Sequence, residues 1–315
     1  MFEALRGSDK SIVIAEVGQN HQGSFETAVQ YIRSISLSGA DFVKFQMRDN
    51  KTLFTHKAYN QLYNSENSFA KTYGEHREAL ELTKEELKLL RKECEKQNIG
   101  FMCTPFDEVS LEWLTSIGTD IIKVASFDLA NVPFLDLIGK TKTPVIMSTG
   151  GGNLSHVRDS LRQLNEHHND VAILHCVSEY PTHYSRLGLN KIIELREMFP
   201  NNVIGLSDHF NGISSGVVGF MKGARIFEKH VTLDRSWKGT DHSFSLEING
   251  FAKFVRDIRR TPEMFQAKPD VELGYEPVFK RLGKVLSAKK FIGKGELLTI
   301  ENLSSKICVE EGIPV

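Results

Sequence analysis

The sequence of 315 residues lacks the features that mark several special classes of protein. It contains no apolar run of about 18 residues, so we expect no transmembrane helix and no membrane partner. Its 39 Lys and Arg residues are balanced by 40 Asp and Glu residues, and this net charge of −1 argues against general nucleic-acid binding. The first ten residues carry charges of both signs and no apolar segment, so they do not predict a signal peptide.

Cysteine is scarce and widely spaced. The four cysteines, Cys94, Cys103, Cys176 and Cys308, form no CxxC pair. This pattern predicts free thiols in a reducing, cytoplasmic compartment rather than a disulfide framework or a zinc site. We expect Cys103 and Cys176, which lie in predicted strands, to fill small spaces in the core.

Short segments rich in branched apolar residues alternate with helical patterns eight times between residues 11 and 260. The predicted strands span residues 11–18, 41–46, 100–106, 121–126, 144–150, 171–180, 203–209 and 225–233. Helices are expected at 24–38, 83–97, 108–117, after Pro133, and at 155–167, 190–199, 214–222 and 246–260. Eight such units predict an α/β fold, a (β/α)8 TIM barrel. A doubly wound open sheet is the alternative, but no glycine-rich phosphate fingerprint follows the first strand.

Two regions depart from this alternation. Residues 51–81 are polar and aromatic, and they are either a functional cover over the active face or an exposed insertion. Residues 262–277 contain three prolines and are typical of a linker. We therefore expect a barrel domain over 1–261, a linker over 262–280 and a partial β-rich segment over 281–315, with strands at 284–288 and 297–300. That segment is too short to hold a core alone.

TIM-barrel enzymes carry their chemistry at the carboxyl ends of the strands, where this sequence places polar residues. Lys44 and Lys123 lie within predicted strands, and buried lysines need an anionic partner, so we expect a bound phosphate or carboxylate. The glycines of residues 148–152 allow close backbone approach to such an anion. His209 and His230 end neighbouring strands and could share a divalent cation, although each could equally be structural. The residues alone leave the reaction undetermined.

Several collinear motifs resemble the sialic acid synthase family, which condenses phosphoenolpyruvate with an N-acylated amino sugar. The resemblance covers about residues 11–260, and residues 281–315 resemble the start of the antifreeze-like (SAF) domain of that family. The motifs are Ile14-Ala-Glu-Val-Gly-Gln-Asn-His-Gln-Gly23, Val43-Lys-Phe-Gln46, Thr104-Pro-Phe-Asp107, Ile122-Lys-Val-Ala-Ser126, Ser148-Thr-Gly150, Glu179-Tyr-Pro181, Gly205-Leu-Ser-Asp-His209, Glu228-Lys-His230 and Asp241-His242.

The resemblance implies a role for each matching residue. Glu16, Lys44 and Lys123 match catalytic positions, with Glu16 beside the reacting carbons. The positions that hold phosphoenolpyruvate are matched by Lys44, Thr104, Lys123, Ser126, Ser148 and Ser207, and those near the sugar by Gln46, Asp128, Tyr180 and Asp241. His209 and His230 match the ligands of a divalent metal, Mn²⁺ in this family, with Mg²⁺ or Co²⁺ as alternatives. The resemblance also implies a homodimer.

Some positions depart from the family pattern. Asp128 stands where bacterial members often carry Glu, and residues 306–308 lack an arginine that reaches the partner subunit's sugar. We therefore expect an incomplete SAF segment. The strings over 71–76 and 237–242 look like animal-type members that use a 6-phosphorylated sugar. Synthesis of a legionaminic, pseudaminic or KDN-type acid is the alternative, as are a related 3-deoxy-sugar-acid synthase and a catalytically impaired sugar-binding homologue.

Overall fold

The computed structural model describes residues 1–269, 276–308 and 312–313. The chain divides into two compact units, Met1–Pro262 and Glu263–Val315. Each unit is described by itself below. None of the described helices is long and apolar enough to cross a membrane.

The first unit is a closed parallel β-barrel, which confirms the predicted TIM-barrel fold. Each strand pairs in parallel with the next in sequence, and β1 also pairs with β8, so that Glu16 lies beside His230. The barrel strands are β1 (Ile12–Gly18), β2 (Phe42–Met47), β3 (Gly100–Pro105), β4 (Ile121–Val124), β5 (Val145–Ser148), β6 (Val171–Cys176), β7 (Val203–Asp208) and β8 (Ile226–Thr232). A two-residue strand, β9 (Leu246–Glu247), pairs with the end of β8.

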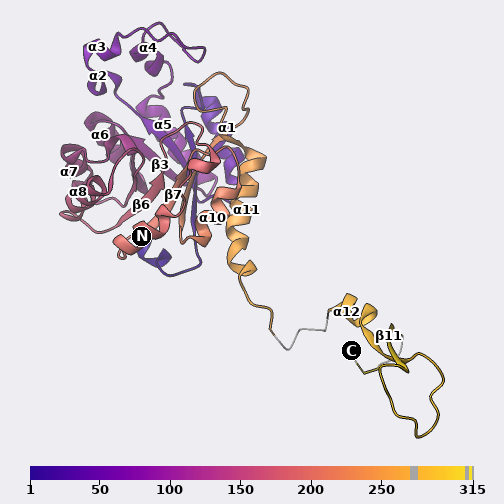
Figure 1. Ribbon diagram of the computed structural model, residues 1–315. Helices are drawn as coiled ribbons and strands as arrows, with labels where there is room; N and C mark the ends of the chain where they lie inside the picture. Colours follow the sequence, from indigo (N-terminus) through magenta and orange to yellow (C-terminus); the bar gives the residue numbers. More distant parts are fainter. Residues whose placement is uncertain (270–275, 309–311, 314–315) are drawn as a thin grey trace. The chain divides into compact units, whose positions relative to one another are not determined.

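Helices cover the outside of this barrel (Figure 1). They are α1 (Phe25–Ser36), α5 (Lys84–Lys96), α6 (Glu108–Ile117), α7 (Val132–Lys140), α8 (Leu154–Asn165), α9 (Lys191–Met198), α10 (Ser214–Met221) and α11 (Ile248–Met264). Local sequence signals set several boundaries. Thr83 and Glu86 form a reciprocal capping box at the start of α5, and Gly118 ends α6 with a φ of +85°.

The barrel interior has an apolar lower layer and a polar upper layer. At the amino-terminal end of the strands, inward-facing apolar side chains pack with Phe2 and Leu5 of the short helix η1 (Phe2–Leu5). The buried strand residues of this layer are Ile14, Met102, Ile121, Ile146, Ala172, Leu174, Val203 and Ile226. Toward the carboxyl ends, the same strands present buried polar and charged side chains. The apolar layer therefore closes the bottom of the barrel and leaves the chemistry at the top.

The segment between β2 and α5 differs from the expected loop. It contains three short helices, α2 (Asn50–Leu53), α3 (His56–Tyr59) and α4 (Tyr73–Glu78), which lie together at one end of the barrel (Figure 1). The aromatic residues pack on one another, with the rings of Tyr63 and Tyr73 centred 4.6 and 6.0 Å from that of buried His76. Each helix is shorter than two turns, which is too short for a helical repeat of apolar residues to be recognised in the sequence.

Two element ends were predicted wrongly. The sixth strand ends at Cys176 rather than near Tyr180, because its pairing with β7 ends at Cys176, opposite Ser207. The last barrel helix continues through Pro262 to Met264 instead of ending at Arg260. Its buried face, which includes Phe254, Ile258 and Thr261, continues past the predicted end.

The second unit contains α12 (Pro277–Leu282), β10 (Lys284–Ala288) and β11 (Leu303–Ile307). Strands β10 and β11 pair antiparallel. The predicted strand at 297–300 is wrong, because Thr299 accepts hydrogen bonds from the backbones of Asn302 and Leu303 and forms a turn. The α12 helix begins inside the predicted linker, 262–280, and ends two residues beyond it. Several apolar side chains of this unit are exposed, among them Phe291 at 91%.

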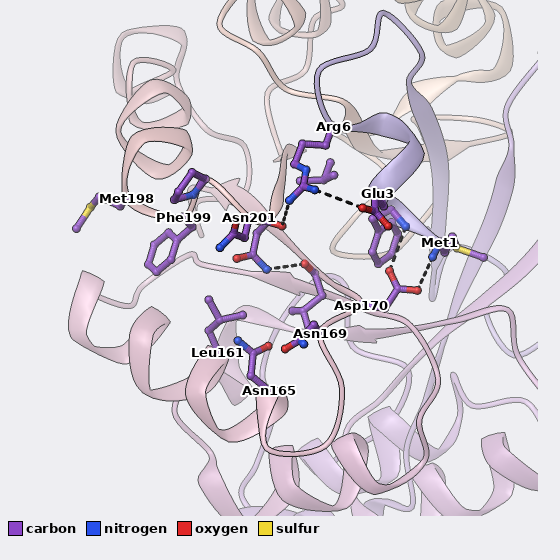
Figure 2. Close-up of a pocket in the computed structure, with 15 residues that line it drawn as sticks. Met1, Glu3, Arg6, Leu161, Asn165, Asn169, Asp170, Met198, Phe199 and Asn201 are labelled. Carbon is purple, nitrogen blue, oxygen red and sulfur yellow. Dashed lines mark hydrogen bonds and ion pairs between the residues drawn. The ribbon is translucent and has the colours of Figure 1, made fainter.

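A cavity of about 660 Å³ lies at the amino-terminal end of the barrel, beside η1 (Figure 2). Its charged groups are already paired. The amino group of Met1 lies 2.6 Å from Asp170, and Arg6 contacts both Glu3 and the backbone oxygen of Asn201. This cavity lies at the amino-terminal ends of β6 and β7, away from the polar upper layer.

Candidate active site

Strand periodicity decides which polar side chains enter the barrel. Alternate residues of a strand face opposite sides, so Glu228 and His230 of β8 face inward while Lys229 faces the helices. Lys229 accordingly pairs with Asp208 at 2.5 Å on the outer side of the strands. Ser207 of β7 is hydrogen-bonded to Glu228, on the inner side. This parity separates a catalytic layer from a structural ion pair in adjacent residues.

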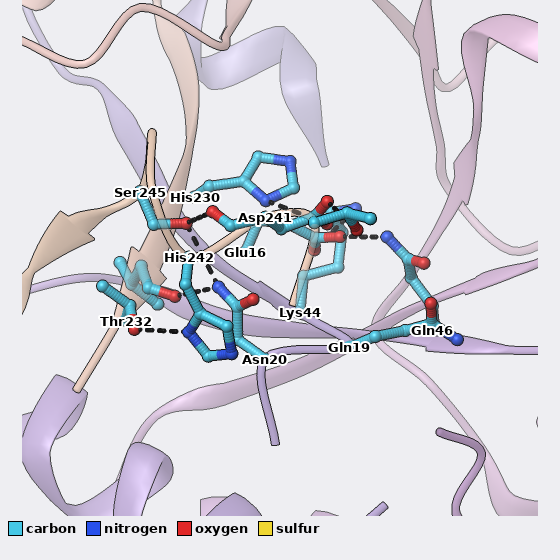
Figure 3. A network of polar contacts seen from close by, with 12 residues as sticks. Glu16, Gln19, Asn20, Lys44, Gln46, His230, Thr232, Asp241, His242 and Ser245 are labelled. Atoms are coloured by element: carbon cyan, nitrogen blue, oxygen red, sulfur yellow. Dashed lines mark hydrogen bonds and ion pairs between the residues drawn. The ribbon is translucent and has the colours of Figure 1, made fainter. Parts of the chain in front are cut away.

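Two lysines and two glutamates form a buried cluster in this layer, with all four side chains at most 6% exposed. Lys44 Nζ lies 2.8 Å from Glu16 Oε2 and 3.6 Å from Glu228 Oε2, and it donates to Thr104 Oγ1 at 3.1 Å. Lys123 Nζ lies 4.0 Å from Glu228 Oε2 and donates to the backbone oxygen of Val124. The anionic partners required by the lysines are thus supplied in part by the chain itself. Figure 3 shows Glu16 between Lys44 and Gln46.

The two carboxylates have opposite pKa shifts. Burial raises the pKa of Glu16, against the opposing effect of Lys44 and with reinforcement from Glu228. Burial acts in the same direction on Glu228, but Lys123, Lys44 and His230 outweigh it and lower its pKa to about 2. Glu228 is therefore a permanent anion, whereas Glu16 is the carboxyl group better able to accept a proton.

The two lysines also differ. Burial lowers the pKa of Lys123 despite the nearby Glu228. Burial acts likewise on Lys44, but Glu16 and Glu228 outweigh it and raise its pKa. Lys123 is thus the lysine whose charge is less compensated, and an added anion would gain most from it.

Small polar groups border Lys123 at the ends of β4 and β5. The backbone N–H of Gly150 donates to Ser126 Oγ at 3.0 Å. A Cβ atom at position 150 would lie 2.3 Å from Ser178 Oγ and 2.8 Å from Ser126 Oγ. Only glycine therefore leaves room for both hydroxyls to lie against the backbone here. The hydroxyls of Ser148 and Ser178 are buried and have no hydrogen-bond partner within the described part of the chain. Unpartnered buried hydroxyls are available to a ligand.

The two predicted metal ligands lie side by side, with ring centroids 5.3 Å apart. His209 Nδ1 lies 2.8 Å from the backbone oxygen of Val177, an arrangement that fixes the tautomer, and Nε2 makes no hydrogen bond within the described residues. Burial lowers the pKa of His230, which favours its neutral ring, and within the same residues His230 Nδ1 is buried without a hydrogen-bond partner. Asp241 Oδ2 lies 3.8 Å from His230 Nδ1, and the ring of Tyr180 lies 4.1 Å from that of His209.

These features fit a divalent cation held by two imidazoles. No group of three or more His, Cys, Asp and Glu residues that could hold a metal occurs in the described part of the chain. Water and substrate oxygens would therefore complete the coordination sphere. Cys103 and Cys176 are both buried, as expected, and Cys176 Sγ also lies 4.0 Å from His209 Nδ1.

Gln46 links the cluster to the barrel rim. Its Nε2 donates to Glu16 Oε1 at 2.7 Å, and its Oε1 accepts from Arg48 Nη2 at 2.6 Å. A side chain at Gly18 would lie 3.2 Å from Gln46 Nε2, 3.2 Å from Glu16 Oε1 and 3.7 Å from Asp241 Oδ2. The missing side chain of Gly18 therefore leaves space where these three groups converge.

The structure brings most of the predicted site residues into one layer, and Asp128 stands apart. Contacts through Lys44 and Glu228 join the residues Glu16, Gln46, Thr104, Lys123 and Ser207. Ser148 of β5 and Ser126, two residues after β4, border them. Asp128 accepts from Asn131 at 3.0 Å and, in the described part of the chain, makes no hydrogen bond or ion pair with the charged cluster.

Glu228, Arg48 and Glu81 were not among the predicted site residues. The period of two on β8 could have identified Glu228, which shares a face with His230.

The comparisons with known proteins agree with this geometry. The NeuB family matches residues 31–269. Human N-acetylneuraminate-9-phosphate synthase is 34% identical over 98% of this chain and 86% of its own length. N,N'-diacetyllegionaminic acid synthase of Campylobacter jejuni is also 34% identical, over 94% of this chain and 90% of that protein.

A solved structure shows that the similarity extends to the fold. The N-acetylneuraminic acid synthetase of Leptospira borgpetersenii, crystallised with citrate, superimposes with a TM-score of 0.72 at 31% identity. The match covers 84% of this chain and 89% of that one. The resemblance to sialic acid synthases is thereby confirmed, and this chain belongs to the NeuB family.

Proposed function

We propose that this protein condenses phosphoenolpyruvate with an N-acylmannosamine-type sugar, free or 6-phosphorylated, to give a sialic acid or related nonulosonic acid and phosphate. The observation that carries the proposal is the buried pair of lysines beside unpartnered serine hydroxyls, within one barrel mouth that also holds two neighbouring imidazole rings. Phosphoenolpyruvate needs cationic and hydroxyl partners for two anionic groups. The named relatives, synthases of N-acetylneuraminate 9-phosphate and of legionaminic acid, support the same chemistry.

The proposed reaction joins carbon 3 of phosphoenolpyruvate to the aldehyde carbon of the open-chain sugar. Lys44 and Lys123 would hold the phosphate and carboxylate of phosphoenolpyruvate. Four hydroxyl side chains would donate further hydrogen bonds to these two groups: Thr104, Ser126, Ser148 and Ser207. Positive charge then develops at carbon 2, where the Glu16 carboxylate would stabilise it and orient an attacking water. Water adds to carbon 2 and gives one proton to Glu16, which passes it to the oxygen of the former aldehyde. The bond between carbon 2 and the phosphate oxygen then breaks, and the leaving phosphate takes the bonding electrons and the proton of the new hydroxyl, whose oxygen becomes the keto oxygen. The raised pKa of Glu16 suits this role.

His209 and His230 would hold a divalent metal, Mn²⁺ with Mg²⁺ or Co²⁺ as alternatives. When bound, the metal supplies polarisation of the sugar's carbonyl oxygen. Asp241, Tyr180 and Gln46 would line the sugar on the same side. We extend the proposal to a cytoplasmic homodimer, which rests on the resemblance and on the free cysteines.

The test measures phosphate release from phosphoenolpyruvate with Mn²⁺ and one sugar at a time. The candidate sugars are N-acetylmannosamine, its 6-phosphate, mannose 6-phosphate and two 2,4-diacetamido sugars. Release with one sugar, and a product mass equal to the condensation product, supports the synthase and names its substrate. Absence of release with every sugar, from folded protein that binds Mn²⁺, argues for the impaired homologue.

A further inference from the structure

We propose that Arg48 is a positioning residue that sets the orientation of the Gln46 amide and, through it, of Glu16. This inference rests on the proposed function, because it concerns how Glu16 and the sugar side of that site are held. Arg48 follows β2 directly and is only 7% exposed. Its guanidinium lies 3.9 Å from the centre of the Phe106 ring, which fixes the plane of the fork.

The donors and acceptors around Gln46 permit one orientation of its amide. Arg48 has only donors, so the amide atom 2.6 Å from Arg48 Nη2 must be the oxygen. The amide nitrogen then faces the other way and donates to Glu16 Oε1 at 2.7 Å. A flipped amide would set its N–H₂ against the guanidinium and its oxygen against the carboxylate, and both contacts would be repulsive.

This orientation has two consequences at the site. Glu16 is held at both oxygens, by Gln46 at Oε1 and by Lys44 at Oε2, so its carboxylate cannot rotate. The second N–H of Gln46 remains available on the side of Gly18 and Asp241. Gln46 therefore presents a donor to the substrate, and it selects an acceptor there, such as a hydroxyl or N-acyl oxygen of the sugar.

Arg48 is itself anchored to the far end of the inserted segment. Its backbone N–H donates to Glu81 Oε2 at 3.2 Å, and its Nη1 donates to Glu81 Oε1 at 3.2 Å. Glu81 also accepts from Gln19 at 2.8 Å, and Gln19 in turn accepts from Arg77 of α4. Because Arg48 and Glu81 bracket residues 49–80, the pair closes the base of this segment. The segment thus contacts Glu16 through a chain of hydrogen bonds.

The experiment compares R48M, Q46L, the double variant and a matched control, R225M. Arg225 also lies over a phenyl ring, 4.1 Å from that of Phe220, but before β8 at the other end of the barrel. With the sugar that the wild-type enzyme uses, R48M should lower kcat about tenfold and raise the KM for sugar, with the KM for phosphoenolpyruvate within about twofold. In the Q46L background, R48M should change kcat less than about twofold.

Either of two kinetic results would overturn the proposal. One is an R48M enzyme with kcat and sugar KM within about twofold of wild type. The other is the same loss from R48M with and without Gln46, since Arg48 would then act by another route. R225M should lower the melting temperature without moving kcat or either KM.

A second readout needs no turnover and separates this inference from the proposed function. In nitrogen-15 NMR spectra, one side-chain amide proton of Gln46, assigned by its loss in Q46L, should be shifted downfield and exchange slowly because it is bonded to Glu16. In R48M this signature should disappear. A Gln46 signal unchanged in folded R48M would overturn the proposal, even if the wild type proved inactive with every sugar.

Discussion

At the residue scale, the charged side chains in the barrel mouth stabilise one another, but the positive charge of the lysines is only partly compensated. Glu228 is shared between two lysines, at 3.6 Å from Lys44 and 4.0 Å from Lys123. A buried ion pair with imperfect geometry gains little over its desolvation penalty. The cluster is therefore arranged for ligand binding more than for stability.

Replacing Lys123 separates these two contributions. We expect K123M to remain folded, with a free energy of unfolding within about 2 kcal/mol of wild type, because Glu228 keeps Lys44. Its affinity for phosphoenolpyruvate should fall at least about tenfold, since a charge-assisted contact is lost. Thermal unfolding and calorimetric titration measure both quantities. Wild-type affinity in K123M would contradict the assigned role.

Gly150 offers a steric test of the anion pocket. A methyl group there would lie 2.3 Å from Ser178 Oγ, so G150A should weaken phosphoenolpyruvate binding at least about tenfold. G7A is the matched control, because Gly7 has a φ of +71° and nothing within 4 Å of its missing side chain, and it lies outside the proposed anion pocket. G7A should cost about 1 kcal/mol of stability and leave binding unchanged. Equal affinities in the two variants would argue that the pocket lies elsewhere.

At the element scale, the turn after β1 depends on a neutral histidine. His21 is 2% exposed, and its Nδ1 accepts from the backbone N–H of Gly23 at 3.1 Å. Burial lowers its pKa from 6.5 to about 4. Protonation of His21 would place a positive charge in this buried site and remove the acceptor of the hydrogen bond from Gly23.

This histidine should make the fold acid-sensitive. The unfolded chain binds a proton at His21 below pH 6.5, while the folded chain resists it until about pH 4. The stability from this group is thus full above pH 6.5 and lost as the pH falls toward 4, by roughly 3 kcal/mol. H21Q should flatten the unfolding free energy over this range, and H56Q, on the exposed α3, should not. An unchanged slope in H21Q would refute this account.

At the same scale, the sequence predicted an element correctly where capping residues set its ends. The α6 helix begins and ends where Asp107 and Gly118 require. The sixth strand was predicted four residues too long, because no glycine or proline marks its end before Pro181. The short helices within residues 50–78 were not predicted, because each is stabilised by tertiary packing rather than by an apolar repeat in its own sequence.

The same limit applies to the site. Lys44, Lys123, His209 and His230 could be proposed because their residue types are unusual within strands. The sharing of Glu228 could not, since it requires the closure of β1 on β8. The contact of Arg48 with Glu81 spans 33 residues of sequence and likewise needs the folded barrel.

At the scale of the whole molecule, the core belongs to the first unit. Every residue of both hydrophobic clusters lies between Phe2 and Ile258. A chain truncated after Met264 should therefore melt within about 2 °C of the full-length protein. Differential scanning calorimetry of both chains checks this, and a loss of more than about 8 °C in the truncated chain would show that the second unit stabilises the barrel.

The central claim is that this barrel mouth cleaves the carbon–oxygen bond of phosphoenolpyruvate while joining it to a sugar. The most direct test runs the reaction in ¹⁸O-labelled water with Mn²⁺ and the candidate sugars, and measures label in the phosphate. We predict that phosphate is released only with sugar and carries no ¹⁸O, together with a nonulosonic acid of the condensation mass. Labelled phosphate, or release at the same rate without sugar, would indicate phosphorus–oxygen cleavage by a phosphatase and contradict the account.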